Sequence, residues 1–296
     1  MTIFGRLVAG LVAITLALSG GTASARDGVA APPPGYTMPF TQMWDMPSDD
    51  GQIYRIFVSF PGSGEAPEHG YPVLYVLDGN AMFAAFAEAR RLQEYGELGK
   101  SIVVGVGYPT DDAYDIRRLD DLTAALVDPP PAHLREFAKY RSGGRKTFLD
   151  FLTGRLRREI AARYRVDPDR QSLFGHSFGG LFGLYALHTR PDAFYSIIAA
   201  SPSVEWNEQG VLAEERDFTE RLKAGKIGKT SRLMILVGGR DVDDDPEPAE
   251  AMARRLDRLS GYGLRVRIKR YEDETHISVP VRAVSDTLRF VFAISG

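Results

Sequence analysis

The sequence predicts an α/β fold in which a mostly parallel central sheet is covered by helices on both faces. Continuous apolar runs of strand length, such as residues 71–77, are typical of strands that are buried on both faces. These runs alternate along the chain with segments of helical periodicity, as they do around parallel sheets. The motif Gly-His-Ser-Phe-Gly at residues 175–179 stands between an apolar run and a helical segment, which indicates a sharp turn from strand to helix.

The expected strands are runs of apolar and β-branched residues bounded by glycine, proline, aspartate or asparagine, which end strands. They lie at residues 52–60, 71–77, 101–106, 172–174, 196–200, 232–237 and 264–271. Some of these runs end in polar turns, at residues 78–80, 201–203 and 238–241. These turns therefore place polar side chains just beyond the ends of the strands.

The expected helices are segments in which apolar residues recur every three or four positions. They lie at residues 82–89, 148–160, 181–187, 252–259 and 281–292. Residues 108–144 differ, because they are dense in aspartate, arginine and proline and have no sustained period. Such a long irregular insertion in a compact domain favours a pocket wall or a lid.

The N-terminus is typical of a secretory signal peptide. Arg6 is the only charge before the apolar run at 7–18, and Ala23-Ser24-Ala25 matches a small-residue cleavage site. The run is too short for a permanent membrane span, although an N-terminal tether is the alternative interpretation. We therefore expect a signal peptide at 1–25 and a single domain at 26–296, without stable membrane insertion, in the periplasm or secreted.

The composition excludes several classes of function. The chain has no cysteine, so thiol chemistry, lipid attachment at the cleavage site and cysteine-based metal sites are ruled out. Removal of Arg6 with the signal would change the formal net charge from −3 to −4. This weak acidity gives no reason to expect nucleic acid or an anionic membrane as a partner. The oligomeric state stays open.

The residues around Ser177 have the spacing of a nucleophile elbow. A serine on such a turn projects its hydroxyl out of the sheet, and Gly175 and Gly179 would let the strand and the helix pack closely. The turn also directs the Phe178 N–H, at a helix N-terminus, toward a developing oxyanion. The alternative is an ordinary glycine-rich turn with an incidental serine.

A serine nucleophile needs a general base, and His276 is the predicted one. In α/β-hydrolases the acid and then the histidine follow the serine along the chain, each after a strand. His188 also follows Ser177, but on one helix it would lie about 16 Å away. His276 comes just after the last expected strand. His176 faces away from the nucleophile across the turn, so we interpret it as packing or pocket wall.

The acid and the second oxyanion donor complete the predicted site. Asp241 ends the strand before the last one and is the favoured acid, with Asp243 second. A calcium site in this acidic run is disfavoured, because the run lacks the glycine and distal glutamate of an EF-hand loop. The predicted second donor is the Asn80 N–H, in the turn after an earlier strand; the alternative is a simple turn before a helix.

Six motifs in the same order resemble the putative-esterase family of α/β-hydrolases, most closely the enterochelin esterase and trilactone siderophore hydrolase group. They are YPVLYVLDGNAMF at 71–83, VGYP at 106–109, FLDFL at 148–152, GHSFGG at 175–180, ASPS at 200–203 and ETH at 274–276. The resemblance, which runs from about residue 36 to the C-terminus, implies a serine esterase with Ser177 as nucleophile and His276 as base. The group includes periplasmic siderophore hydrolases, which agrees with a signal peptide.

The chain departs from this group in two places that concern the substrate. Val-Glu-Trp at 204–206 stands where paired aromatics are expected, and Asp120 offsets part of the charge of Arg117 and Arg118. The two arginines, together with Trp206 and Tyr108, are the predicted substrate-binding residues, and exposed loop side chains are the alternative.

Together these features predict an exported serine carboxylesterase that works through a Ser-His-Asp triad and an acyl-enzyme, with a siderophore-type (trilactone) ester as the candidate substrate. Its partner would be a small-molecule ester, and the chemistry needs no cofactor or metal. An acyltransferase on the same acyl-enzyme and a non-catalytic binding protein on the same scaffold are the alternatives. The natural ester is not named by the sequence.

Overall fold

The computed structural model describes residues 35–241 and 245–293, so the predicted signal peptide at 1–25 lies outside the described residues. Its centre is an eight-stranded sheet with the order β1-β2-β4-β3-β5-β6-β7-β8. The strands are β1 (Thr41–Pro47), β2 (Ile53–Ser59), β3 (Tyr71–Leu77), β4 (Ile102–Gly107), β5 (Val166–His176), β6 (Ser196–Ala200), β7 (Arg232–Gly238) and β8 (Val266–Tyr271). β1 and β2 pair antiparallel, as do β2 and β4, and all other neighbours are parallel. The chain therefore has the predicted α/β-hydrolase fold.

All seven expected strands are present, and β1 is the strand that the sequence did not predict. β1 lies at the edge of the sheet, and only Met46 in it is buried. An edge strand without a buried apolar stripe has little periodic signal, which explains why it was missed. By contrast, β3, β4, β6 and β7 are almost fully buried, as their continuous apolar sequences predicted.

The expected helices are also present, with different bounds. They are α2 (Gly79–Gln93), α4 (Arg145–Phe151), α5 (Arg157–Arg163), α6 (Phe178–Thr189), α9 (Glu247–Asp257), α10 (Val279–Arg282) and α11 (Val284–Phe292). A single π-helical turn, Leu152–Leu156, joins α4 to α5. The insertion at 108–144 holds the short helix α3 (Arg118–Leu122) and the 3₁₀ helix η1 (Ala132–Lys139). The helices α7 (Trp206–Gln209) and α8 (Val211–Lys223) were not expected.

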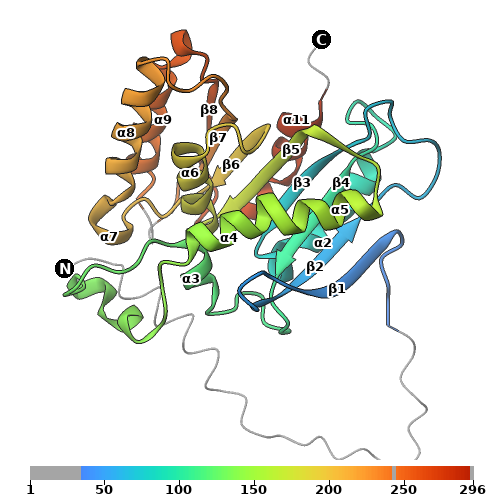
Figure 1. Ribbon diagram of the computed structural model, residues 1–296, viewed down its shortest axis with the longest axis horizontal. Coiled ribbons are helices and arrows are strands. Elements are labelled where there is room, and N and C mark those ends of the chain that lie inside the picture. Colours follow the sequence, from blue (N-terminus) through green and yellow to red (C-terminus); the bar gives the residue numbers. More distant parts are fainter. Residues whose placement is uncertain (1–34, 242–244, 294–296) are drawn as a thin grey trace, which may run out of the picture.

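Helices cover both faces of the sheet (Figure 1), and the sheet separates two hydrophobic cores, one on each face. Alternate residues of β3 supply both: Tyr75 belongs to one core and Leu74 to the other. The first core packs against α4, α5, α6, α8 and α9. The second core packs against α2 and α11, and both helices are rich in buried residues. This two-sided cover confirms the predicted architecture.

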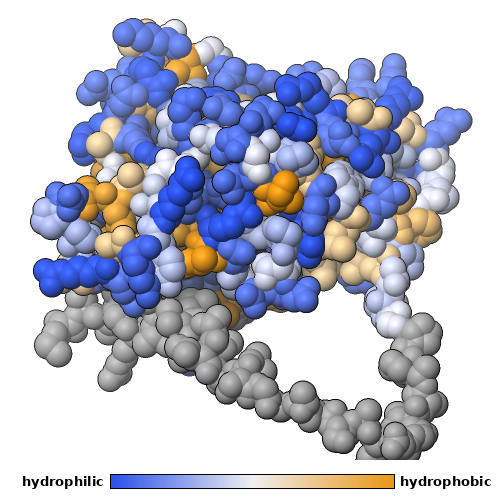
Figure 2. Space-filling view, turned by 60° about the horizontal axis from the view of Figure 1, so that its bottom comes forward, coloured by the Kyte–Doolittle hydropathy of each residue, from blue (hydrophilic) through white to orange (hydrophobic). Residues whose placement is uncertain are grey.

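The parallel strands position the candidate site, because the loops at their carboxyl ends gather along one edge of the sheet. Asp78 follows β3, Ser177 follows β5, and Asp241 and His276 follow β7 and β8. The four residues thus come together from segments that are up to 198 positions apart in sequence. No helix within the described ranges is long and apolar enough to cross a membrane. The face drawn in Figure 2 is mostly hydrophilic, with separate hydrophobic spots.

Candidate active site

Ser177 occupies the strained turn between β5 and α6. Its φ is 58° and its ψ is −117°, a conformation that non-glycine residues rarely adopt. A Cβ on Gly175 would lie 2.1 Å from the Gly179 carbonyl oxygen, which confirms the predicted close approach at Gly175. At Gly179 the expectation was wrong, because a Cβ there would make only ordinary contacts at 3.6 Å. Gly180 is the tighter position, since its Cβ would lie 3.0 Å from the Ala200 carbonyl oxygen.

The side chains of His276 and Asp241 form a buried hydrogen-bonded pair. His276 Nδ1 lies 2.9 Å from Asp241 Oδ2, and the side chains are 5% and 2% exposed. Because a carboxylate only accepts hydrogen bonds, this contact places the proton of a neutral imidazole on Nδ1 and leaves Nε2 free to take a proton. The rival acid, Asp243, lies outside the described residues.

Two backbone hydrogen bonds join the loop that carries Asp241 to the loop that carries His276. The Gly239 N–H donates to the Tyr271 carbonyl at 2.7 Å, and the Arg240 N–H donates to the Glu274 carbonyl at 2.9 Å. The approach needs glycine, because a Cβ on Gly238 would lie 2.6 Å from the Glu274 oxygen. The glycine pair at the end of β7 therefore brings acid and base together.

His176 joins the elbow to the His276 loop. Its Nε2 lies 2.9 Å from the His276 carbonyl oxygen, and the centroids of the two rings are 4.7 Å apart. His176 is 3% exposed, so the expected packing role fits, but the sequence did not predict the hydrogen bond. Burial, reinforced by His276 and Arg118, holds the pKa of His176 well below 6.5. The His176 ring is therefore neutral at physiological pH.

The nucleophile hydroxyl contacts a second serine. Ser177 Oγ lies 3.1 Å from Ser203 Oγ, and the Ser203 N–H donates to the Ser177 carbonyl at 3.3 Å. Within the part of the chain that the structure describes, Ser203 is the hydrogen-bond partner of this hydroxyl. Either hydroxyl can be the donor in this contact, so Ser177 can accept from Ser203 and keep its own proton available for a base. Ser203 stands in the Ser-Pro-Ser turn after β6, where sequence reasoning assigned it no role.

The predicted oxyanion donors both lie in the first turn of a helix. Phe178 begins α6, and Asn80 is the second residue of α2. The Asn80 side chain fixes the loop after β4: Nδ2 donates to the carbonyls of Tyr108 and Thr110 at 3.0 and 2.8 Å, and Oδ1 accepts from the Tyr108 N–H at 2.8 Å. The roles of the Phe178 and Asn80 N–H groups in catalysis stay predictions.

Arg118, a predicted substrate-binding residue, is engaged within the protein. Its guanidinium donates to both carboxylate oxygens of Asp78, at 2.7 and 2.9 Å, and to the His176 carbonyl at 3.4 Å. The guanidinium also lies 5.1 Å from the centre of the Phe178 ring. Burial disfavours the charged guanidinium and so acts to lower the pKa of Arg118. The charge and hydrogen bonds of Asp78 act in the opposite direction, and the pKa of Arg118 is raised overall. These contacts connect the α2 turn to the elbow.

Arg117 is only partly engaged, because its Nη2 is buried without a hydrogen-bond partner among the described residues. Nη1 donates to the Ile53 carbonyl at 3.0 Å, and the guanidinium lies over the rings of Tyr54 and Tyr108 at 5.4 and 5.1 Å. Tyr108 is 4% exposed, and its hydroxyl donates to Asp121 at 3.0 Å. Tyr108 therefore does not provide the open aromatic surface expected from the sequence.

Trp206 is 3% exposed, so it too differs from an open pocket wall. Its Nε1 donates to the Ala124 carbonyl at 3.2 Å, and its ring lies edge-on to Phe178 at 5.1 Å. Phe137 of η1 packs edge-on against Trp206 at 5.6 Å and against Phe178 at 6.3 Å. The inserted segment thus reaches the elbow through Phe137, which the sequence analysis did not single out.

One groove in the described part of the chain is separate from the elbow. A groove of about 610 Å³ lies between β1 and α5, remote in the fold from the elbow, and none of the predicted site residues lines it. Its arginines are partly paired, Arg155 with Asp49 at 3.1 Å and Arg163 with Glu159 at 2.6 Å. Within residues 35–241 and 245–293, no group of three or more histidines and acids could hold a metal ion.

Comparison with known proteins shows the family of the chain. The sequence profile of the family described as "Putative esterase" matches residues 51–272. The ferri-bacillibactin esterase BesA of Bacillus subtilis is 34% identical over 88% of this chain and 92% of its own length. The siderophore enterobactin esterase of Emericella nidulans is 32% identical over 86% of this chain and 94% of its own length. Among solved structures, the BES protein from Bacillus cereus superposes with a TM-score of 0.74 and 30% identity, covering 89% of this chain and all of that one.

Proposed function

The chain belongs to the family described as "Putative esterase", and from this premise we propose that it is an exported serine esterase that hydrolyses siderophore-type esters through an acyl-enzyme. As a member of that family, the chain is an enzyme that acts on carboxylic ester bonds. The observation that carries the finer proposal is the buried pair of His276 and Asp241 beside the Ser177 elbow, with 2.9 Å between Nδ1 and Oδ2. A histidine oriented in this way is a suitable base for a serine.

The proposed reaction has two halves. His276 Nε2 takes the Ser177 proton while Oγ bonds to the ester carbonyl carbon, and the Phe178 and Asn80 N–H groups stabilise the oxyanion. The tetrahedral intermediate collapses as the ester C–O bond breaks, and the imidazolium returns its proton to the leaving alcohol. Water then attacks the acyl-enzyme with His276 as base again, releasing the acid and restoring Ser177. Asp241 stabilises the imidazolium in both halves.

The substrate class is supported by the relatives rather than by the predicted substrate-binding residues. The similar bacterial and fungal proteins are named for bacillibactin and enterobactin, and each spans most of this chain. In this chain, however, Arg118 is held by Asp78, and Arg117 donates through Nη1 to the Ile53 carbonyl, so the two arginines do not form a free pair. We therefore propose that the substrate is a siderophore ester and that its recognition does not depend on Arg117 and Arg118 as a free pair.

The direct test measures hydrolysis of a catecholate trilactone and of p-nitrophenyl esters of increasing chain length, with Ser177→Ala alongside. We expect the trilactone to be opened, and kcat to fall by roughly 10⁵–10⁶-fold in the variant. Turnover of simple esters alone would reject the siderophore substrate and leave a general carboxylesterase. Equal rates for wild type and variant would reject the serine mechanism.

Two additions to this test address the alternatives. With an acceptor alcohol present, a dominant new ester instead of free acid would identify an acyltransferase. A fluorophosphonate that fails to label Ser177 would favour a binding protein without turnover.

Export is tested separately. We propose that the signal at 1–25 directs the chain to the periplasm or outside the cell. N-terminal sequencing of the exported protein should begin at Arg26, and a product that retains Met1 in a membrane fraction would favour a tether.

A further inference from the structure

We propose that His176, the residue before the nucleophile, is a positioning residue that holds the base His276 within reach of Ser177. The inference rests on the proposed serine-esterase function. His176 Nε2 lies 2.9 Å from the His276 carbonyl oxygen, and this is a direct side-chain contact between the elbow and the loop of the base. In the sequence, His176 is the residue between Gly175 and Ser177 for which the elbow motif specifies no residue type.

The sheet order explains why such a contact is needed. The elbow follows β5 and the base follows β8, with β6 and β7 between them. Neighbouring strands are about 4.8 Å apart, so the two strand ends are separated by roughly 14 Å. The hydrogen bonds from Gly239 and Arg240 attach the His276 loop to β7 but not to β5. The contact from His176 supplies the connection to the elbow itself.

The chemistry of the contact defines the state of His176. A carbonyl oxygen only accepts, so Nε2 carries the proton. Nδ1 is buried and has no hydrogen-bond partner among the described residues, so a neutral ring with the proton on Nε2 satisfies the site best. The His176 backbone is restrained on the other side, since Arg118 Nη2 donates to its carbonyl at 3.4 Å.

Neutrality of His176 matters for the base. The two imidazole centroids are 4.7 Å apart, so a charged His176 would oppose the imidazolium that forms on His276 during acyl transfer. The groups that face His176 are His276, which can become charged, and Arg118, which is. Both disfavour a second positive charge, and burial acts in the same direction. A lysine or arginine at this position could donate the same hydrogen bond but would carry that charge.

The closing experiment compares two substitutions of similar size. In His176→Gln the amide Nε2 is as many bonds from the backbone as the histidine Nε2, and it can donate to the His276 carbonyl. In His176→Met the side chain fills the space but has no donor. The control is His188→Met. His188 is 1% exposed, packs against Phe218, and neither of its ring nitrogens has a partner among the described residues. It therefore reports the effect of losing a buried imidazole elsewhere.

We expect His176→Met to lower kcat by about 30–100-fold with KM nearly unchanged, because displacing a catalytic group by about 1 Å costs this much. Gln at 176 should stay within about fivefold of wild type, and the His188→Met control within about twofold. Equal kcat values for the Met and Gln variants at 176 would overturn the proposal. So would an equal loss in the His188 control, because it would mean that removal of any buried imidazole has the same effect.

A second measurement does not depend on turnover. Long-range ¹H–¹⁵N NMR of the imidazoles should show His176 neutral at pH 5, with its proton on Nε2. His276 resonances should shift in His176→Met but not in His176→Gln. A His176 ring that titrates near pH 6.5, or that is protonated on Nδ1, would overturn the positioning role. An inactive wild-type protein with the expected spectra would refute the proposed esterase function and leave the contact between the two histidines established.

Discussion

Asp241 receives the hydrogen bond of His276 in a nearly water-free position, with 2% of its side chain exposed. Replacement by Asn presents an amide that can donate to Nδ1 and so favours the wrong imidazole tautomer. We therefore expect Asp241→Asn to lower kcat by about 10³–10⁴-fold with little change in KM. Steady-state kinetics on a p-nitrophenyl ester would measure this loss.

The matched control for this substitution is Asp243→Asn, which removes the rival carboxylate from the same acidic run. It should keep kcat within about threefold of wild type, as expected for a charge outside the triad. The opposite ranking, a large loss at Asp243 and a small one at Asp241, would transfer the acid role to Asp243.

Arg118 allows the substrate-binding and positioning interpretations to be separated. Its guanidinium donates to both carboxylate oxygens of Asp78. Asp78 directly precedes the first turn of α2, which carries the Asn80 N–H. We expect Arg118→Lys to lower kcat on a small neutral ester by about tenfold, because a lysine cannot reproduce the bidentate contact. Asp78→Asn should have a similar effect. A rise in KM for an anionic substrate, with kcat on neutral esters unchanged, would instead restore the substrate-binding role.

These residues show what could be predicted about the site. Ser177, His276 and Asp241 were proposed because motif spacing and chain order restrict where a triad can lie, and the structure places the latter two in contact. The partners of Arg118 were not predictable, because a sequence shows that a guanidinium exists but not which carboxylate, 40 positions away, it will meet. The contact of His176 was missed for the same reason, since its partner is 100 positions away.

At the scale of elements, the buried parallel strands were predicted well and the exposed or short elements poorly. β7 is recognisable because every side chain after its first residue is buried, so the sequence must be apolar throughout. α8 was missed although it buries Val211, Phe218 and Leu222, because charged residues dominate the intervening positions. A helix that is buried on one narrow face leaves a weaker apolar pattern in the sequence than a strand that is buried on both faces.

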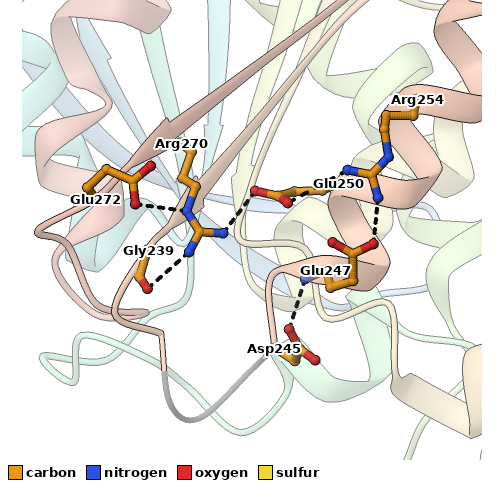
Figure 3. Close-up of polar contacts among 7 residues, drawn as sticks. All are labelled: Gly239, Asp245, Glu247, Glu250, Arg254, Arg270 and Glu272. Atoms are coloured by element: carbon orange, nitrogen blue, oxygen red, sulfur yellow. Dashed lines mark hydrogen bonds and ion pairs between the residues drawn. The ribbon is translucent and has the colours of Figure 1, made fainter.

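A polar network around the acid loop carries the next prediction. Arg270 of β8 lies between Glu272 and Glu250, donating to them at 3.0 and 3.1 Å, and also donates to the Gly239 carbonyl at 3.3 Å (Figure 3). Gly239 is two residues before Asp241. We expect Arg270→Met to lower kcat by about threefold to tenfold, because the acid is held less firmly. The denaturant midpoint should hardly change, as is usual when an exposed ion pair is removed.

The comparison variant for this prediction is Arg254→Met. Arg254 pairs with Glu247 and Glu250 in the same network but makes no contact with Gly239 within the described residues (Figure 3). It should leave kcat unchanged within about twofold, as expected for a surface pair. Parallel measurement of kcat and of denaturant midpoints would test both variants, and equal kcat losses would show that Gly239 is not the relevant contact.

At the scale of the whole molecule, the stability of the fold should depend on one buried carboxylate of the insertion. Asp121 of α3 accepts hydrogen bonds from the hydroxyls of Tyr54 and Tyr108, at 2.9 and 3.0 Å, and is 7% exposed. Burial raises the pKa of Asp121 to about 6, although both tyrosines favour the charged form. The folded chain therefore retains this proton over a pH range in which the unfolded chain has lost it.

The sign of the pH dependence follows from this difference. Because the pKa is higher in the folded state, the stabilisation from the bound proton is complete below the unfolded pKa and is lost as pH rises toward and through about 6. In Asp121→Asn the side chain is neutral at every pH and can still bond to both tyrosines. Between pH 4.5 and 7.5, the free energy of unfolding of wild type should therefore fall by about 2 kcal/mol relative to the variant. Urea unfolding of both proteins across this range measures the difference, and parallel pH profiles would show that Asp121 titrates normally in the folded protein.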